Sequence, residues 1–202
     1  MKIYDIISRH SDTVLFSGRF RSFRHALECA VADNTDLTGA DLRARNLSGV
    51  SLDDARLAQA DFTGSNLTGA NLSEAQLRGS SFVNTCLYNT CLAYSDLQGC
   101  SFVDASFGGT DITGSNLSYA TFSTLSCFSL DFVDAAAMTG CVFTNPDGLI
   151  ATMSKPPLVI KGASRSVIIF MDRTVKIDHA LYDYPGGIAF LKKSITDRSR
   201  PH

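Results

Sequence analysis

Large apolar side chains recur at every fifth position through the middle of the chain. From Leu37 to Phe122, 18 consecutive positions at this spacing carry Leu, Phe or Ile without a slip. A small side chain stands two residues before each of them, and Arg45 is the misfit. A period of five fits neither the 3.6 residues of a helix nor the two of a strand. The pattern predicts a square tube that turns a corner in each unit and encloses both the large and the small side chain.

The period continues more weakly beyond Phe122, at Cys127, Phe132, Ala137 and Val142. It therefore predicts 22 units over residues 35–144. The positions between the apolar ones carry Asp, Asn, Ser, Thr, Arg and Gly, which suit an outer wall and its corners.

Several units follow the form A(D/N)Lxx, among them residues 40–44 and 70–74, and 60–64 with Phe in place of Leu. They resemble the units of pentapeptide-repeat proteins. The resemblance implies an all-β fold, a right-handed quadrilateral β-helix with four units per coil, so that residues 20 apart stack. One wall then places four phenylalanines above one another in the interior, which predicts a core ladder of Phe62, Phe82, Phe102 and Phe122.

The flanking segments divide the chain into three predicted parts. Residues 1–34 form a hairpin (2–7 and 13–20) and a capping helix (22–32), residues 35–144 form the β-helix, and residues 145–202 form a small basic, β-rich C-terminal cap with a tail. In that cap we expect strands at 158–161, 166–171 and 174–181, and a short helix at 188–193. The order of hairpin, helix and repeats is similar to that of phage- and prophage-type members of the family.

No motif for catalysis, cofactor binding or metal binding emerges. The six cysteines include no CxxC pair, no GxSxG or glycine-rich phosphate loop is present, and the four histidines are scattered. We expect Cys86 and Cys91 to face outward, Cys100 and Cys127 to face inward, and all of them to be free thiols. We therefore predict no catalytic residue, no cofactor, no metal and no enzyme activity.

Charge is distributed unevenly along a chain whose formal net charge is only −2. Residues 33–144 hold four Lys or Arg and twelve Asp or Glu, whereas residues 145–202 hold nine and five. Half of those twelve acids fall on one predicted wall, formed by the blocks 50–54, 70–74, 90–94, 110–114 and 130–134. This acidic wall has no Lys or Arg and carries Asp53, Asp54, Glu74, Asp111, Asp131 and Asp134.

Two interpretations of this wall remain open. Asp and Asn are favoured at repeat corners whatever the function, so the wall can be a product of composition alone. The family resemblance implies a sharper hypothesis, because some members imitate duplex DNA in shape and charge and bind type II topoisomerases, notably DNA gyrase. The acidic wall would then occupy a basic DNA-binding groove.

A rigid phage- or prophage-type adaptor is the alternative, in which the C-terminal cap recognises a host protein. In both cases we expect a protein partner, no direct binding to nucleic acid, and a cytoplasmic location in a bacterial or phage-infected cell. No apolar run approaches the roughly 20 residues that a membrane span needs, so no membrane association is expected. Self-association through a solenoid end or a cap stays open.

Overall fold

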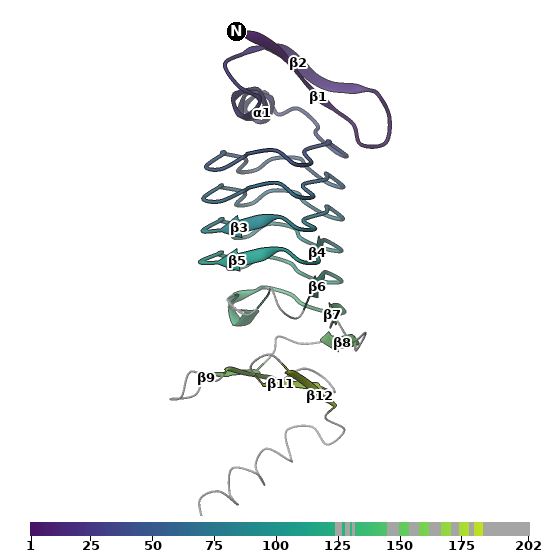
Figure 1. Ribbon diagram of the computed structural model, residues 1–202, viewed down its shortest axis with the longest axis vertical. Coiled ribbons are helices and arrows are strands. Elements are labelled where there is room, and N and C mark those ends of the chain that lie inside the picture. The colour runs from purple at the N-terminus through teal and green to yellow at the C-terminus, as the bar shows by residue number, and fades with distance from the viewer. Residues whose placement is uncertain are drawn as a thin grey trace, which may run out of the picture.

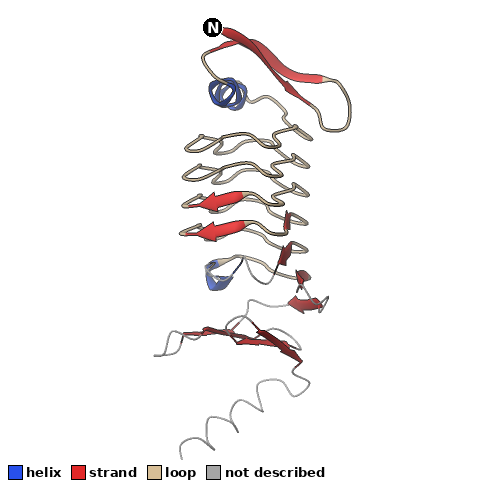
Figure 2. Ribbon diagram, in the orientation of Figure 1, coloured by secondary structure: helices blue, strands red, loops and turns tan. Residues whose placement is uncertain are grey.

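The computed structural model describes residues 1–123, 127, 130 and 132–144, together with the backbone of five later strand segments at 150–153, 158–161, 167–170, 174–177 and 180–183. Flat coils are stacked one upon another, with a hairpin and a helix at the N-terminal end (Figure 1). Most of each coil is turn rather than extended strand (Figure 2). This follows from the five-residue unit, which leaves only one to three residues between corners.

The N-terminal segment covers the open edge of the first coil. Strands β1 (Lys2–Ile7) and β2 (Val14–Phe20) form an antiparallel hairpin. Just after β1, the amide of Arg9 donates to the carbonyl of Gly39 at 2.7 Å, and the carbonyl of Ile7 accepts from the amide of Asp41 at 2.8 Å. Backbone groups that would otherwise form a bare sheet edge are thereby paired.

Helix α1 (Phe23–Ala32) follows the hairpin, and Ser22 caps its first turn by accepting a hydrogen bond from the amide of His25. The buried face of the helix consists of Ala26, Leu27 and Ala30. Arg45, the misfit of the repeat, is exposed and places its guanidinium 4.1 Å from the centroid of the Phe23 ring. The side chain that breaks the pattern thus helps to hold the helix on the coils.

Parallel pairing between residues 20 apart builds the stack. Single bridges join, for example, Asn46 to Asn66 and Ser51 to Asn71. Where pairing is longer it gives short parallel strands: β3 (Cys86–Tyr88) with β5 (Ser106–Gly108), and β4 (Ser101–Phe102) with β6 (Thr121–Ser123). Four units of five residues therefore make one coil.

Each corner is turned by a residue in the left-handed region. From residue 39 to residue 119, every fifth residue has a positive φ, and many of these are glycines such as Gly64 at +69°. Non-glycine residues also occupy such corners, including Tyr94 at +58° and Tyr119 at +63°. A tyrosine there is strained relative to glycine or asparagine.

The interior is a column of large apolar side chains. Phe62, Phe82, Phe102 and Phe122 are buried, with successive ring centroids 5.0 Å apart and ring planes within 9° of parallel. The small positions at the inner corners add hydrogen bonds where they carry a hydroxyl or thiol. Thr85 Oγ1, for instance, donates to the carbonyl of Phe62 at 2.7 Å, and Cys100 Sγ donates to that of Leu77 at 3.0 Å.

The repeat register slips by one residue near its end, which corrects the prediction for Ala137 and Val142. These two side chains are only half-buried, whereas Met138 and Phe143 are buried. Strand β6 accordingly pairs Thr121 with Val142, 21 residues on. The slip replaces small or branched interior groups by large ones, and the Phe143 ring stacks on that of Phe122 with centroids 5.3 Å apart.

Past the 3₁₀ helix η2 (Phe132–Asp134), strand β7 (Cys141–Thr144) pairs in parallel with β6 and in antiparallel fashion with β8 (Ile150–Met153). A separate antiparallel sheet follows, with the strand order β12-β11-β10-β9. Its strands are β9 (Leu158–Lys161), β10 (Val167–Phe170), β11 (Thr174–Ile177) and β12 (Ala180–Asp183). The single strand predicted at 174–181 was wrong, because β11 and β12 pair with each other. The helix predicted at 188–193 lies outside the described residues.

Candidate protein-binding surface

Five of the six predicted acidic-wall residues are described, and all five are exposed: Asp53, Asp54, Glu74, Asp111 and Asp134. Asp131 lies outside the described residues. The stack separates the five into columns, one for each position within the unit. Asp53 lies on the flat of the wall, Asp111 at the start of its unit, Asp54 and Glu74 at the corner, and Asp134 in the 3₁₀ helix η2.

Asp54 and Glu74 belong to one vertical series of left-handed corner residues 20 apart, here called the corner column. Backbone hydrogen bonds tie neighbouring coils together along it: the amide of Asp54 donates to the carbonyl of Ser73 at 3.0 Å, and that of Glu74 to the carbonyl of Ala93 at 2.9 Å. The corner column consists of Asp54, Glu74, Tyr94 and Gly114, whereas Asp134, one coil further, lies in the 3₁₀ helix η2. Its side chains therefore project from successive coils along one edge of the solenoid.

Asp111 has a structural task in addition to its charge. Its Oδ1 accepts a hydrogen bond from the amide of Thr113 at 2.9 Å, and hydrogen bonding to Thr113 lowers the pKa of the carboxyl. The same turn occurs at nine described positions, Asp111 included, each at the residue that precedes the central apolar one and with either Asp or Asn as acceptor. The (D/N) of the repeat is thus a turn-forming residue first.

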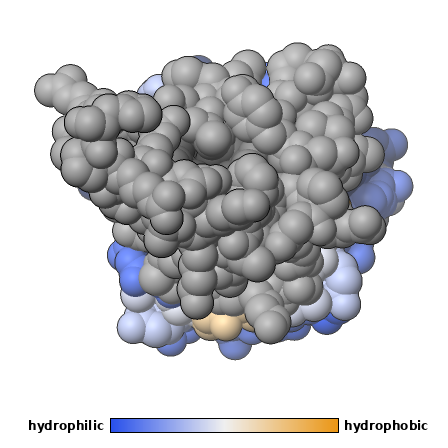
Figure 3. All heavy atoms as spheres, turned by 90° about the horizontal axis from the view of Figure 1, so that it is seen from below, coloured by the Kyte–Doolittle hydropathy of each residue, from blue (hydrophilic) through white to orange (hydrophobic). Residues whose placement is uncertain are grey.

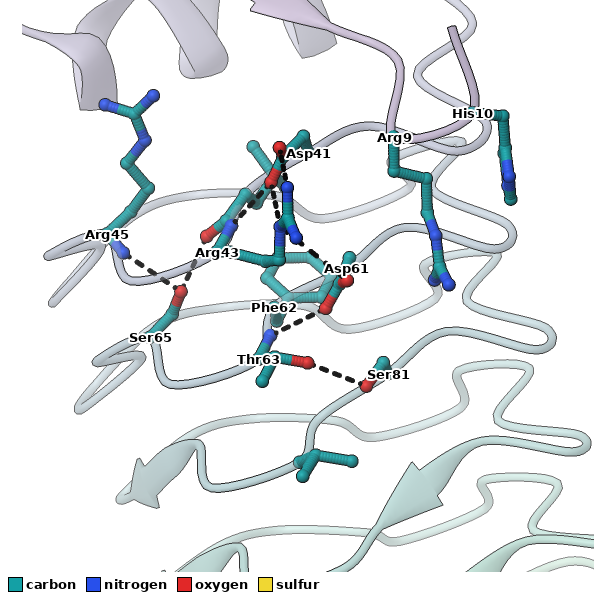
Figure 4. Close-up of polar contacts among 12 residues, drawn as sticks. Arg9, His10, Asp41, Arg43, Arg45, Asp61, Phe62, Thr63, Ser65 and Ser81 are labelled. Atoms are coloured by element: carbon teal, nitrogen blue, oxygen red, sulfur yellow. Dashed lines mark hydrogen bonds and ion pairs between the residues drawn. The ribbon is translucent and has the colours of Figure 1, made fainter.

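Two of the three acids on the wall that contains the phenylalanine ladder are compensated by an arginine (Figure 4). This Phe wall comprises the blocks 40–44, 60–64, 80–84, 100–104 and 120–124. Arg43 donates from Nε and Nη2 to the two carboxylate oxygens of Asp41 at 2.8 and 2.7 Å, and its Nε lies 3.9 Å from Asp61 Oδ2. The hydrogen bond from Arg43 is the main reason that the pKa of Asp41 is lowered.

The acidic wall has no such compensation within the described part of the chain. The ion pairs there involve Arg24, Arg43 and Arg56, and none of their carboxylate partners belongs to the acidic wall. Asp53 accepts a hydrogen bond from the Ser51 hydroxyl at 2.8 Å, which leaves its charge in place. The wall therefore presents net negative charge to solvent.

Helix α1 adds one carboxylate that the repeat pattern could not reveal. Glu28 Oε1 accepts a hydrogen bond from the amide of Ser51 at 3.3 Å, next to Asp53 on the acidic wall. Arg24 Nε lies 3.7 Å from the same oxygen and offsets part of its charge. Glu28 stands outside the five-residue period, so only the docking of the helix brings it to this wall.

Exposed tyrosines are a second feature that sequence reasoning missed. Tyr94 and Tyr119 are 67% and 63% exposed, respectively. Each lies beside a glycine of the next coil: a methyl group added to Gly114 would overlap the Tyr94 ring, and one added to Gly140 would overlap the Tyr119 ring. The signal was present in the sequence as a tyrosine at a corner position with a glycine 20 or 21 residues further on.

Within the described residues, no group of three His, Cys, Asp or Glu side chains is arranged to hold a metal ion. No helix among them has the length and apolar character needed to cross a bilayer. Seen from the C-terminal end, the described atoms at the rim are largely hydrophilic, with one small apolar area (Figure 3). The distinctive surface of the described region is therefore the acidic wall with its corner column.

Comparison with known proteins gives one family and several solved structures. Eight copies of the model described as pentapeptide repeats match segments within residues 35–124. A pentapeptide-repeat protein from the Arabidopsis thaliana thylakoid lumen is 31% identical, with 51% of this chain and 68% of that chain covered and a TM-score of 0.40. No curated protein matches the chain.

Two further structures are more distant. HetL, a protein involved in heterocyst differentiation regulation from the cyanobacterium Nostoc sp. strain PCC 7120, is 28% identical over 45% of this chain and 52% of its own, with a TM-score of 0.34. QnrB1, a plasmid-mediated fluoroquinolone resistance protein, is 21% identical over 57% and 69%, with a TM-score of 0.25. The chain thus spans about half to two thirds of these proteins.

The family assignment rests on the repeats themselves. The eight matched copies coincide with the segment in which residues 20 apart pair in parallel. Membership implies a right-handed β-helix for this segment. Through its residues 35–124, the chain belongs to the pentapeptide-repeat family.

Proposed function

We propose that this protein is a non-catalytic binding solenoid whose acidic wall engages a basic groove of a DNA-handling protein, such as a type II topoisomerase of the gyrase class. The supporting observation is the contrast between walls: two of the three carboxylates of the Phe wall, Asp41 and Asp61, are paired with Arg43, whereas those described on the acidic wall have no cationic partner in the described region. Unpaired surface carboxylates remain available to cations of a partner.

The spacing of the charges supports imitation of a nucleic acid strand. Coils stack at about 4.8 Å, so the four steps from Asp54 to Asp134 span about 19 Å. Five described acids within that span give about one charge per 4 Å. One strand of duplex DNA carries a phosphate about every 3.4 Å along the axis. The linear charge density of the wall is therefore close to that of one strand.

The matched variants follow from the geometry. Asp53→Asn, Asp54→Asn, Glu74→Gln and Asp111→Asn together remove four charges from the acidic wall, and asparagine preserves both the turn at 111 and the left-handed backbone at 54. A control removes four charges from other walls in the same way, by Asp36→Asn, Asp61→Asn, Asp96→Asn and Asp104→Asn. Net charge is equal in the two variants, so only the location of the charge differs.

The readouts are inhibition or protection of topoisomerase supercoiling and pull-down of the enzyme, each at low and moderate salt. We expect the wild type and the control to bind, with an affinity that falls at least about tenfold between about 50 and 200 mM salt, and the wall variant to lose binding. Duplex DNA should compete. Equal binding by the wall variant and the control would refute the proposal.

A third variant tests the adaptor alternative, in which the C-terminal cap carries recognition. It neutralises Arg173, Lys176, Lys192 and Lys193 and leaves the solenoid intact. Loss of binding in this variant, together with normal binding by the wall variant, would replace the DNA-mimic proposal by the adaptor.

A further inference from the structure

The corner column contains an aromatic residue, Tyr94, in the coil that follows its two acids, Asp54 and Glu74. Tyr94 lies one coil below Glu74, whose amide donates to the carbonyl of Ala93 at 2.9 Å, and the amide of Tyr94 donates to the carbonyl of Thr113 at 2.8 Å. Asp111 opens the unit of the next coil on the same wall. A large, mostly exposed ring thus lies on the acidic wall, with a carboxylate residue at the same corner of the coil before it.

The ring of Tyr94 is held at its base. Its Cδ1 and Cε1 atoms occupy the space that a side chain at residue 114 would need, and residue 114 is a glycine. A ring supported in this way loses little conformational freedom on binding, because part of its contact surface is already formed. With 67% of the residue exposed, the rest of the ring is available to a partner.

The surroundings select one kind of side chain. The acidic wall has no Lys or Arg in the sequence, and the described acids of this wall have no ion pair in the described region. An aromatic face attracts a cation, and a carboxylate beside it accepts hydrogen bonds from the same cation. A planar guanidinium can do both at once, since it stacks on a ring and binds a carboxylate with two N–H groups.

We propose that Tyr94 is the anchor for an arginine of the partner, stacked on the ring and hydrogen-bonded to a neighbouring carboxylate such as Glu74. This inference rests on the proposed function, and it identifies arginine as the side chain of the partner's basic groove that binds at the corner column. A lysine has the same charge and is attracted to the same carboxylates, but its ammonium group cannot stack on the ring and form a bidentate hydrogen bond to a carboxylate.

Nona-arginine and nona-lysine peptides serve as the probes, titrated separately into the full chain labelled with ¹³C in its tyrosine rings. We expect the Tyr94 ring resonances to shift on addition of nona-arginine, and that peptide to bind about 3- to 10-fold more tightly than nona-lysine. Tyr94→Asn, which suits the left-handed backbone, should abolish the preference, whereas Tyr94→Phe should retain it. Tyr119→Asn is the control, since it removes an equally exposed tyrosine from a different corner.

The outcomes separate this inference from the proposed function. If both peptides bind equally and the loss of charge on the acidic wall weakens both, the wall binds cations and the arginine anchor is wrong. If neither peptide responds to that loss of charge, the proposed function fails as well. A preference for arginine that survives Tyr94→Asn would also overturn the anchor.

Discussion

The Phe wall and the acidic wall use the same backbone for different purposes. Both are built from units 20 residues apart with an apolar residue at the centre and an Asp or Asn turn before it. The Phe wall encloses four stacked rings and the thiol of Cys100, and on its outer face Arg43 pairs with Asp41 and Asp61, two of the three acids of that wall. The acidic wall has aliphatic side chains such as Leu72 and Leu92 inside and bare carboxylates outside. Stability and recognition are thus placed on different faces of one tube.

Truncation of the ladder should give the largest effect on the Phe wall. Phe82 is fully buried between two rings whose centroids lie 5.0 Å away on either side. We expect Phe82→Ala to lower the free energy of unfolding by about 3–5 kcal/mol, because it opens a cavity in the middle of the stack. Leu72→Ala, its counterpart on the acidic wall, should cost about 2–4 kcal/mol. Chemical denaturation measures both, and a loss below about 1 kcal/mol for Phe82→Ala would show that the ladder is not a packed interior.

Alkaline pH should also act on the Phe wall. Burial raises the pKa of Cys100 from 9.0 to about 12, so the folded state holds this proton in a range where the unfolded chain releases it. The stability contributed is therefore present below pH 9 and is lost as the pH rises toward 12, on the order of 2 kcal/mol by about pH 10.5.

Cys100→Ser isolates that effect. A hydroxyl already donates to the carbonyl 23 residues earlier at the equivalent position 80, so serine preserves the hydrogen bond and removes the ionisable group. We expect the variant to show a shallower fall in stability between pH 9 and 11, measured by urea unfolding. Identical slopes in the two proteins would contradict the buried thiol.

On the acidic wall, the turn residue should matter more than its charge. Asp111→Ala removes the acceptor of the Thr113 amide and should cost about 1 kcal/mol, whereas Asp111→Asn should be nearly neutral at pH 7. Because the folded pKa of Asp111 is lowered, its stabilisation is present above its ordinary pKa near 4 and is lost as the pH falls below it. The asparagine variant should lack that acid dependence. Equal losses for alanine and asparagine at pH 7 would mean that the charge, not the turn, contributes.

The smallest change in stability should come from removing the arginine that pairs with acids of the Phe wall. Arg43→Met leaves Asp41 and Asp61 unpaired and should alter stability by no more than about 0.5 kcal/mol, since exposed ion pairs contribute little. It should nevertheless raise the affinity of the tube for nona-lysine, because the Phe wall then resembles the acidic wall. Unchanged affinity would show that the arrangement along the corner column, beyond an absence of arginine, determines binding.

The coils could be predicted from the sequence because every unit repeats the same pattern, with a large apolar side chain directed inward and polar side chains directed outward. The register slip could not be predicted, because it depends on which of two adjacent side chains fills the interior of the coil better. Ala137 and Val142 keep the period, but Met138 and Phe143 fill the interior. Only a comparison of packed volumes favours the second choice.

The candidate surface was predictable as a list of acids but not as an arrangement. The five-residue period places Asp54, Glu74 and Asp111 on one wall and does not distinguish among them. In the structure, Asp111 also accepts the backbone hydrogen bond of a turn. Glu28 reaches the wall from a helix outside the repeat. Tyr94 carries no charge, so a count of acidic and basic residues on each wall does not reveal its exposed ring. Contacts between distant segments determine both.

The turn before each central residue has a consequence for how such a tube evolves. At this position aspartate and asparagine accept the same backbone hydrogen bond. An exchange between them therefore changes the surface charge by one unit and leaves the backbone of the coil unchanged. Nine described positions are interchangeable in this way. A lineage of these proteins is free to redistribute its charge from wall to wall by single substitutions, and new partners become accessible without any redesign of the scaffold.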